Sequence, residues 1–393
     1  MQYRIDPKSG NRLSALGYGC MRFTKHAGVI DQEKANREMA LALGMGVNYF
    51  DTAYIYPGSE AALGHFIQAY HCRDRLYIAT KLPHYRVQSI EAAERFFAEE
   101  LSRLQTDHVD YYLMHMLNDE KSWRRLCALG ICEWIAAKKA SGQIRQIGFS
   151  FHGGTAQFKD LVDAYDWDFC QIQFNYMDEH SQAGIEGLRY AHEKGLPVII
   201  MEPLRGGKLA GGLSQAAAAA FEGAQPRRSP AAWALRWIWN HEEVTVVLSG
   251  MNDTAQVEEN CRIASDSLPG ALTGQDMALY ARVLGILRKS TKVGCTGCGY
   301  CQPCPKGVDI PTCFALYNGS YVDGYVNSLR EYMLCTTLRK IRTNAGLCVK
   351  CGKCEQHCPQ HIPIRQELDN VKRRMENPLY KIAANVVPMI MKY

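Results

Sequence analysis

Eight repeats of a short strand followed by a helix are the feature that most limits how this chain can fold. Short runs rich in β-branched and aromatic residues alternate with longer runs of helical periodicity. Eight such repeats in about 250 residues predict an α/β fold, a closed (β/α)8 TIM barrel rather than an open sheet. The expected strands cover residues 16–19, 48–52, 76–81, 110–115, 145–150, 169–174, 197–202 and 244–249. The expected helices cover residues 32–46, 59–70, 89–104, 121–142, 155–165, 182–195, 228–241 and 253–263, and a hairpin is expected over residues 3–14.

Four polar residues lie at or just beyond the carboxyl ends of three successive expected strands. Asp51, Lys81 and His115 are at strand ends, and Tyr56 is in the loop after Asp51. Each alone has a structural explanation: a turn cap for Asp51, a solvated lysine, a satisfied core histidine. Catalytic groups of TIM barrels come from the carboxyl ends of strands, so their joint position favours one catalytic site.

Short motifs in the barrel region carry a resemblance to a known family. They are Phe50-Asp-Thr-Ala-Tyr-Ile-Tyr56, Thr80-Lys81, Asp110-Tyr-Tyr-Leu-Met-His115, Ile147-Gly-Phe-Ser150, Gln171-Ile-Gln-Phe-Asn175, Glu202-Pro-Leu204, Ser249-Gly-Met251 and Glu259-Asn260. With these motifs, the first 265 or so residues resemble the aldo/keto reductase superfamily. The resemblance implies a catalytic tetrad of Asp51, Tyr56, Lys81 and His115.

The chemistry of carbonyl reduction suits these four residue types. Hydride transfer to a carbonyl leaves an alkoxide that needs a proton, and a phenol with a pKa of about 10 is a poor acid–base catalyst at neutral pH unless its ionised form is stabilised. Lys81 would stabilise the ionised Tyr56, and Asp51 would keep Lys81 charged and oriented. His115 would donate a hydrogen bond to the carbonyl oxygen of a small-molecule substrate.

The same resemblance implies a nicotinamide nucleotide, NADP or NAD, at the carboxyl ends of the later strands. Phe151 and Met201 stand where many members of the family have an asparagine and an aromatic residue, and the loop after strand eight lacks the usual basic residues. Plain NAD or another electron donor therefore stays open. The implied nucleotide-binding residues are Ser150, Gln173, Leu204, Ser249, Gly250, Met251, Glu259 and Asn260, with Arg205 and Lys208 as substitute cations for a 2′-phosphate.

Eight of the sixteen cysteines lie in two tight motifs after residue 294. The N-terminal sequence has no apolar run typical of a secretion signal, so we expect a cytoplasmic protein, in which metal ligation is favoured over disulfides. Both motifs resemble the cluster motifs of bacterial ferredoxins, and the second matches the C-x2-C-x2-C-x3-C-P run in full. The resemblance implies two [4Fe–4S] clusters. The motifs are Cys295, Cys298, Cys301 and Cys304, followed by Pro305, and Cys348, Cys351, Cys354 and Cys358, followed by Pro359.

Two assignments of these cysteines to clusters are open. In two-cluster ferredoxins the cysteine before the proline ligates the other cluster, which pairs Cys358 with the first motif and Cys304 with the second. The first motif has two rather than three residues between Cys301 and Cys304, so a closed set of four per motif is the alternative. Structural zinc is the competing metal.

The composition divides the chain into three parts. The barrel is expected over residues 1–265, a linker and helix over 266–290, and a smaller, mostly helical ferredoxin-like domain over 291–393. Its apolar C-terminal tail, residues 379–391, is expected to pack on its own domain, with a dock for a partner or a membrane surface as the alternative.

The expected function is an oxidoreductase of the aldo/keto reductase type in which the barrel binds nucleotide and substrate and the clusters carry single electrons. Hydride moves two electrons and a cluster moves one, yet no flavin motif is visible to link them. Two alternatives follow: an electron-transfer protein linked to ferredoxin or another carrier, and an ordinary NAD(P)H reductase with structural clusters. The net charge of +5 predicts no nucleic-acid partner, and no apolar run predicts a membrane span. The loops after strands one, four and seven are expected to determine the identity of the substrate.

Overall fold

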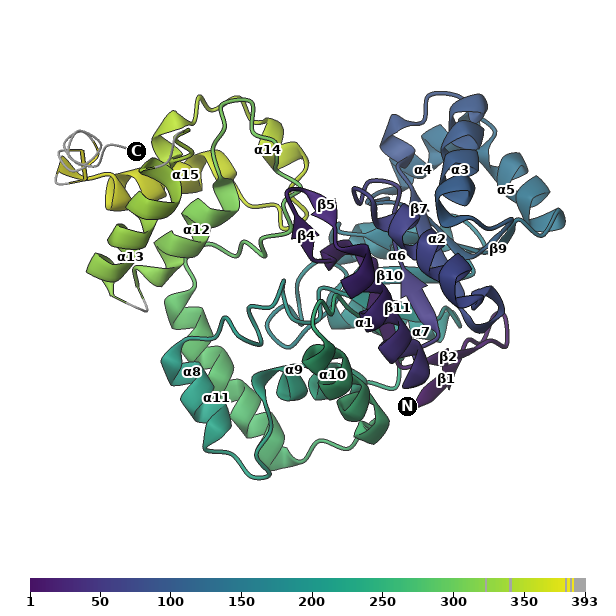
Figure 1. Ribbon diagram of the computed structural model, residues 1–393, viewed down its shortest axis with the longest axis horizontal. Helices are drawn as coiled ribbons and strands as arrows, with labels where there is room; N and C mark the ends of the chain where they lie inside the picture. The colour runs from purple at the N-terminus through teal and green to yellow at the C-terminus, as the bar shows by residue number, and fades with distance from the viewer. Residues whose placement is uncertain (322–323, 339–340, 379, 382–383, 385–393) are drawn as a thin grey trace. The chain divides into compact units, whose positions relative to one another are not determined.

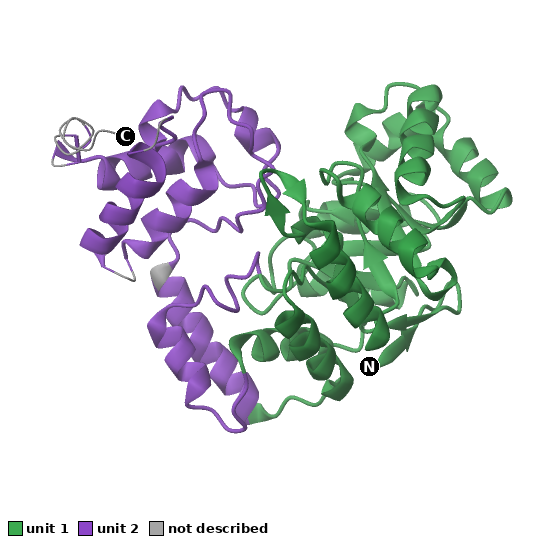
Figure 2. Ribbon diagram, in the orientation of Figure 1, with its two compact units in different colours: residues 1–204, 229–274 green, residues 205–228, 275–393 purple. Residues whose placement is uncertain are grey.

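The computed structural model describes residues 1–321, 324–338, 341–378, 380–381 and 384 (Figure 1). The chain divides into two compact units (Figure 2). The first unit comprises residues 1–204 and 229–274, and the second comprises residues 205–228 and 275–393.

The first unit is a closed barrel of eight parallel strands, which confirms the expected (β/α)8 fold. Each strand pairs with the next one around the barrel, and the last pairs with the first through Val247 and Leu16. Apart from one or two residues at their ends, the strands are the expected ones. They are β3 (Leu16–Gly19), β6 (Tyr49–Asp51), β7 (Tyr77–Leu82), β8 (Val109–Met114), β9 (Ile144–Phe151), β10 (Phe169–Gln173), β11 (Val198–Met201) and β12 (Val244–Ser249).

The helices that connect these strands also follow the expected pattern, with one difference. The helix expected over residues 121–142 is two helices, α4 (Glu120–Ala128) and α5 (Ile131–Ala140). They are separated at Gly130, whose φ of 91° belongs to the left-handed region that glycine favours. The others are α1 (Gln32–Gly44), α2 (Ser59–Tyr70), α3 (Ile90–Leu104), α6 (Thr155–Asp163), α7 (Gly184–Glu193), α9 (Pro230–Trp239) and α10 (Thr254–Asp266).

Alternation along the strands decides which side chains face the inside of the barrel. A buried core that includes Tyr49, Ala79, Leu113 and Ile199 fills the interior. Successive side chains of a strand point to opposite faces, so residues two positions further along share the inner face. This places Asp51, Lys81, His115 and Met201 on the inner side at the carboxyl ends of their strands.

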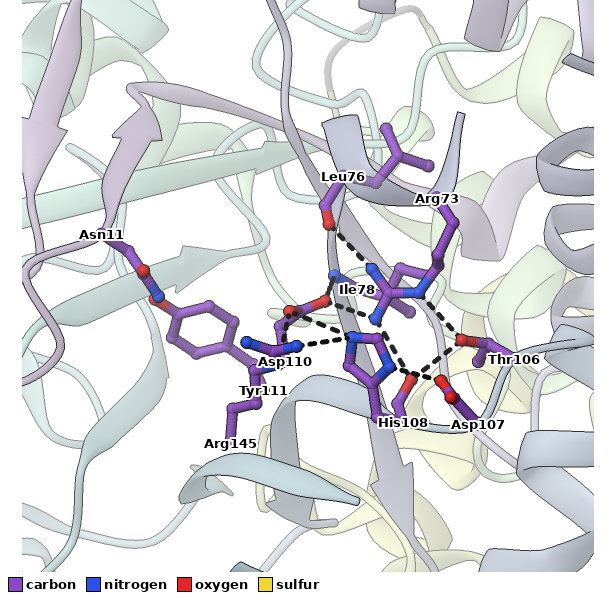
Figure 3. Close-up of polar contacts among 10 residues, drawn as sticks. All are labelled: Asn11, Arg73, Leu76, Ile78, Thr106, Asp107, His108, Asp110, Tyr111 and Arg145. Carbon is purple, nitrogen blue, oxygen red and sulfur yellow. Dashed lines mark hydrogen bonds and ion pairs between the residues drawn. The ribbon is translucent and has the colours of Figure 1, made fainter. Parts of the chain in front are cut away.

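The opposite end of the barrel is held by polar contacts that fix strand register. The carboxylate of Asp110, near the start of β8, accepts hydrogen bonds from Arg73 and from the backbone N–H of Ile78, each at 2.9 Å (Figure 3). Beside it, Tyr111 donates to Asp6, in the turn of the expected hairpin β1 (Tyr3–Ile5) and β2 (Arg12–Ser14). Contacts at this amino-terminal end of a TIM barrel contribute to stability rather than to catalysis. A second hairpin, β4 (Lys25–His26) and β5 (Val29–Ile30), was not expected.

The second unit is mostly helical. Its buried core gathers apolar residues around Phe314, Tyr332 and Val371, with six of the motif cysteines packed against it. Its described helices are α8 (Gln215–Glu222), α11 (Gly274–Ser290), α12 (Ile310–Gly319), α13 (Tyr325–Tyr332), a π-helical turn (Met333–Thr337), α14 (Lys353–Gln356) and α15 (Ile364–Met375). Short 3-10 turns occur in the described part of both units, at Cys20–Arg22, Arg73–Arg75 and His84–Arg86 in the first and at Ala345–Leu347 in the second.

The segment of residues 205–228 follows strand β11 in sequence but packs in the second unit (Figure 2). Phe221 of α8 contacts Tyr280 of α11 edge to face, and Arg228 lies 3.5 Å from the carboxylate of Asp276. The run of alanines in α8 has high helix propensity, yet no helix was expected there.

The end of the chain is described only in part. Tyr380 and Ala384 belong to the core of the second unit, whereas the rest of the apolar tail at 379–391, apart from Lys381, lies outside the described residues. None of the helices in the described part of the chain is long and apolar enough to cross a membrane.

Candidate active site and cysteine pockets

A buried ion pair lies at the carboxyl end of the barrel. Lys81 Nζ is 2.5 Å from Asp51 Oδ1 and donates a second hydrogen bond to the carbonyl oxygen of Thr52 at 2.6 Å. Both side chains are almost fully buried. A buried charge is tolerated only when it is paired and hydrogen-bonded, and both conditions are met here.

The other two members of the expected tetrad surround this pair. The ring of Tyr56 lies over Lys81, with Nζ 5.1 Å from the ring centroid. The ring of His115 meets that of Tyr56 edge to face, with 5.9 Å between centroids and 85° between planes. The structure therefore brings together Asp51 of β6, Lys81 of β7, His115 just after β8, and Tyr56 in the loop that follows β6.

Burial sets the charge of His115. Removal from solvent lowers the pKa of its imidazole well below the usual value, and the nearby Lys81 and two other histidines, His152 and His84, lower it further. A neutral imidazole has one N–H to donate, so His115 can serve as a hydrogen-bond donor that carries no charge.

Gln171 is a member of the site that the sequence analysis did not assign a role. Its Nε2 donates to Asp51 Oδ2 at 2.9 Å, so that both carboxylate oxygens of Asp51 are engaged, one by Lys81 and one by Gln171. Gln171 lies on the inner face of β10 and is buried. Its position two residues before Gln173 on one strand was the available signal, since residues two apart share a face.

Polar groups expected to bind a nucleotide line the ends of the next strands. Ser150 Oγ accepts a hydrogen bond from the backbone N–H of Met116, beside His115. The carboxamide of Gln173 is held by Asp178 and Gln182 in the loop after β10.

At the end of β12 the expected nucleotide-binding residues also lie near one another. Asn260 of α10 donates to Ser249 at 3.1 Å, and both are buried. Met251 is buried, and its carbonyl accepts from Tyr18. Gly250 is exposed, whereas Leu204 and Glu259 are half-buried.

The two departures from the family pattern have different surroundings. Phe151 points away from the barrel interior and packs on Phe158 of α6, with 5.1 Å between ring centroids. Met201 instead packs against the buried core inside the barrel. A sulfur side chain therefore takes the inner position where many family members have an aromatic ring.

Arg22 is a further candidate that the sequence analysis missed. It follows strand β3 and is exposed, and its aliphatic stem packs so closely on Gly250 that a Cβ there would lie 2.9 Å from Arg22 Cγ. Arg22 thus brings a cation to the loop after β12. Its place just beyond a strand end was the only signal in the sequence, because the contact with Gly250 joins segments that lie far apart along the chain.

The structure places Arg205 and Lys208 in the second unit rather than with the barrel. Arg205, which is buried, donates to the carbonyl of Gly294 at 3.0 Å, and Lys208 donates to the carbonyl of Cys295. Both cations thus hold the start of the first cysteine motif. Their assignment to a nucleotide phosphate stays a prediction.

The eight motif cysteines line two pockets of the second unit, four in each. Both pockets are otherwise largely apolar, with Ile310 shared between them. The first is lined by Cys295, Cys298, Cys301 and Cys358, and the second by Cys304, Cys348, Cys351 and Cys354.

Each pocket therefore takes three cysteines from one motif and the last cysteine of the other. Cys358 thus shares a pocket with Cys295, Cys298 and Cys301, although it lies far from them in the sequence. Four thiols that line one largely apolar pocket are a donor set that fits a [4Fe–4S] cluster.

Comparisons with known proteins match both units. Residues 15–271 match the family model of the aldo/keto reductase family, and residues 294–362 match that of a 4Fe-4S dicluster domain. An uncharacterized oxidoreductase of Bacillus subtilis, YrpG, is 32% identical over 232 residues, which cover 54% of this chain and 69% of that protein. L-galactose dehydrogenase of Arabidopsis thaliana is 26% identical over 281 residues, which cover 66% of this chain and 87% of that protein.

Solved structures show the same fold. An aldo-keto reductase from Klebsiella pneumoniae in complex with NADPH superimposes with a TM-score of 0.60 at 24% identity, covering 72% of this chain and 96% of that chain. An aldo-keto reductase from Bacillus halodurans superimposes with a TM-score of 0.59 at 23% identity over the same shares.

Proposed function

The chain belongs to the aldo/keto reductase family, and we propose that it reduces a carbonyl or related group of a small molecule with NADPH or NADH, coupled to one-electron transfer through two [4Fe–4S] clusters. The family expected from the sequence is confirmed by the match over residues 15–271. The observation that carries the proposed reaction is the buried pair of Asp51 and Lys81, with Tyr56 over the ammonium and His115 beside the phenol.

The nicotinamide would supply the hydride when it is bound, and the four side chains would control the transfer of the proton to the carbonyl oxygen. Lys81 stabilises the phenolate of Tyr56 electrostatically, so that Tyr56 can give up its proton to a developing alkoxide at neutral pH. Asp51, fixed by Gln171, holds the Lys81 ammonium in place. Neutral His115 donates a hydrogen bond that orients the carbonyl oxygen.

The polar set at the ends of β9, β10 and β12 fits a nicotinamide nucleotide. Ser150 and Gln173 offer a hydroxyl and a carboxamide at neighbouring strand ends, and Ser249 and Asn260 offer another such pair. The Klebsiella pneumoniae structures that share this fold contain NADPH in one case and NADP with acetate in another. Arg22 beside Gly250 offers a cation for a phosphate, which supports NADPH as the nucleotide.

The two cysteine pockets support two clusters with exchanged ligands. Cys295, Cys298, Cys301 and Cys358 would hold one cluster, and Cys304, Cys348, Cys351 and Cys354 would hold the other. The match to a 4Fe-4S dicluster domain favours iron and sulfur over zinc. When bound, such clusters supply single-electron storage and transfer.

Replacing Tyr56 by phenylalanine tests the proposed reaction. Anaerobically purified protein would be assayed for NADPH oxidation against a panel of aldehydes and ketones, and NADPH binding would be followed by its fluorescence. We expect Tyr56→Phe to lower turnover by about 10²–10⁴-fold, the usual contribution of a general acid, and to leave binding intact. Tyr54→Phe is the matched control, because Tyr54 lies in the same loop but donates to Glu99. Full turnover in Tyr56→Phe would remove Tyr56 from the mechanism.

A protein that chiefly transfers electrons is the second candidate function. It is favoured by the cysteine pocket with an exposed ligand, Cys351. Cys354→Ala, which removes one ligand of that pocket, separates the candidates. If NADPH-dependent reduction survives the loss of that cluster, the cluster is structural, and if substrate is reduced only when reduced ferredoxin is supplied, the electron-transfer function is favoured.

A further inference from the structure

We propose that an acidic one-electron carrier protein docks over the exposed side of the second cysteine pocket. This surface, called the Cys351 edge, consists of Lys306, Val349, Lys350, Cys351 and Lys353. The inference rests on the proposed function, because it assumes a cluster in that pocket. It adds the point at which a reduced carrier gives one electron to a cluster, the carrier being oxidised and the cluster reduced by one electron, and it adds the surface charge of that carrier.

The exposure of the cysteines differs between the two pockets. Of the eight motif cysteines, all of which the structure describes, Cys351 alone is exposed, and the other seven are half-buried. The pocket lined by Cys295 and Cys358 has no exposed cysteine. Single electrons reach a cluster most directly where its ligands approach the surface, so the Cys351 edge is the side from which the pair of clusters is most accessible.

Val349 gives this edge an apolar contact point. Its side chain lies between two ligand positions, is 57% exposed, and lines the same pocket as Cys304 and Cys351. A single exposed hydrophobic residue is ordinary on a protein surface. Here it lines the cysteine pocket, where a transient redox complex needs a small desolvated centre.

Lysines surround this apolar point. Lys306, Lys350 and Lys353 are exposed, and Lys306 lines the pocket itself. Two acids near the edge are paired, Asp369 with Lys350 at 2.7 Å and Glu355 with Arg365 at 2.7 Å. Lys306 and Lys353 form no ion pair within the described part of the chain, and this excess of positive charge at the edge favours a partner with an acidic surface.

The chemistry of the edge excludes two other kinds of ligand. A nicotinamide nucleotide delivers hydride, a pair of electrons, whereas a cluster accepts single electrons. Recognition of a single-stranded nucleic acid by base stacking would need aromatic side chains, and none lines the described pocket. An acidic protein that carries one electron at a time, such as a ferredoxin or a flavodoxin, meets both requirements.

Charge reversal at the edge tests the proposal in the full-length protein with its clusters. The probe is a photoreduced, acidic plant-type [2Fe–2S] ferredoxin. The readout is the rate, in freeze-quenched samples, at which the electron paramagnetic resonance signal of the reduced donor is replaced by that of the reduced [4Fe–4S] clusters. We expect the triple variant Lys306→Glu, Lys350→Glu, Lys353→Glu to slow this second-order rate by roughly 10-fold or more at low ionic strength, and to weaken its salt dependence. Val349→Glu should slow the rate without removing a lysine.

The triple variant Lys8→Glu, Lys121→Glu, Lys139→Glu is the matched control, since it makes the same charge change on exposed lysines of the barrel unit. Iron and sulfide content and the electron paramagnetic resonance spectrum must be unchanged in every variant compared. Equal rates in the edge variant and the control would overturn the proposal. Carbonyl reduction by NADPH is measured in a separate assay. A failure of the docking proposal, which is an electron-transfer rate that does not depend on the edge lysines, is thereby distinguished from a failure of the proposed reductase activity.

Discussion

Lys81 Nζ lies 2.5 Å from Asp51 Oδ1 inside the barrel, with both side chains almost fully buried. Removing one partner of such a pair leaves the other charge buried without compensation, which typically costs about 3–5 kcal/mol. The pair is therefore both a support for the fold and the electrostatic base of the proposed site.

Asp51→Asn should separate these two contributions. Asparagine keeps the shape and can accept from Lys81, but it removes the negative charge that stabilises the ammonium. We expect the free energy of unfolding to fall by about 3 kcal/mol or more, and kcat to fall with NADPH binding retained. Denaturant unfolding and steady-state kinetics check both. Asp166→Asn, whose carboxylate pairs with Lys8 on the surface, should change stability by less than about 0.5 kcal/mol. Equal stability of the two variants would show that the pair does not support the fold.

Arg22 should determine the preference for NADPH. If its guanidinium binds the 2′-phosphate, Arg22→Ala raises KM for NADPH by about 10-fold, the equivalent of one charge-assisted hydrogen bond, and changes KM for NADH little. Arg37→Ala on α1 is the control, because Arg37 is exposed and pairs with Glu33. A parallel rise of KM for both nucleotides would place Arg22 at a phosphate that the two nucleotides share.

Lys208 provides the contrast to Arg22, since the sequence assigns it to the nucleotide and its contact places it at the first cysteine motif. Lys208→Met should lower the midpoint potential of one cluster, because a cation near a cluster stabilises its more negative, reduced form. An unchanged potential together with a higher KM for NADPH would return Lys208 to the nucleotide site.

The exchanged cysteine assignment predicts which substitutions act on the same cluster. Cys358→Ser should perturb the same paramagnetic signal as Cys298→Ser, and Cys304→Ser the same signal as Cys354→Ser. Spectra of the four variants, each reduced by dithionite, check the pairing. Cys335→Ser, outside both pockets, is the control. If Cys358→Ser acted instead on the signal of Cys354→Ser, the closed sets of four would be correct.

Local pattern was enough to predict the barrel and to bring the tetrad together. Strands buried on both faces show as short apolar runs, and a strand end is a place in the sequence as well as in the fold, so Asp51, Lys81 and His115 could be located without a structure. The spacing and the proline also favoured the exchange of Cys304 and Cys358, with a closed set of four per motif as the alternative. The two pockets are lined in the exchanged way, and the assignment of each cysteine to a cluster stays a prediction.

Contacts between distant segments could not be predicted in this way. No periodicity shows that residues 205–228 leave the barrel to pack with α11, or that Arg22 lies against Gly250. This grouping also affects experiments, since deleting residues 266–393 would leave α8 without the Tyr280 contact of its Phe221. Point variants of the cysteines are therefore a cleaner test of the clusters than a deletion of residues 266–393.

Glu100 of α3 should make stability depend on pH. Its side chain is fully buried and accepts a hydrogen bond from Tyr112 at 2.6 Å. Burial, and secondarily the charge of Glu60, raise its pKa well above the ordinary value of 4.5. Above pH 4.5 the folded protein therefore binds more protons at this residue than the unfolded chain does, so the free energy of unfolding falls as pH rises toward the folded-state pKa.

Glu100→Gln should remove this dependence, because glutamine cannot ionise and its carbonyl can still accept from Tyr112. We expect the Tm of the variant relative to the parent to rise between pH 5 and pH 8, measured by scanning calorimetry in buffers of matched ionic strength. Glu193→Gln, on the exposed face of α7, is the control and should show no such trend. Parallel curves of Tm against pH for Glu100→Gln and the parent protein would mean that Glu100 does not titrate across this window, and that burial alone does not control its proton.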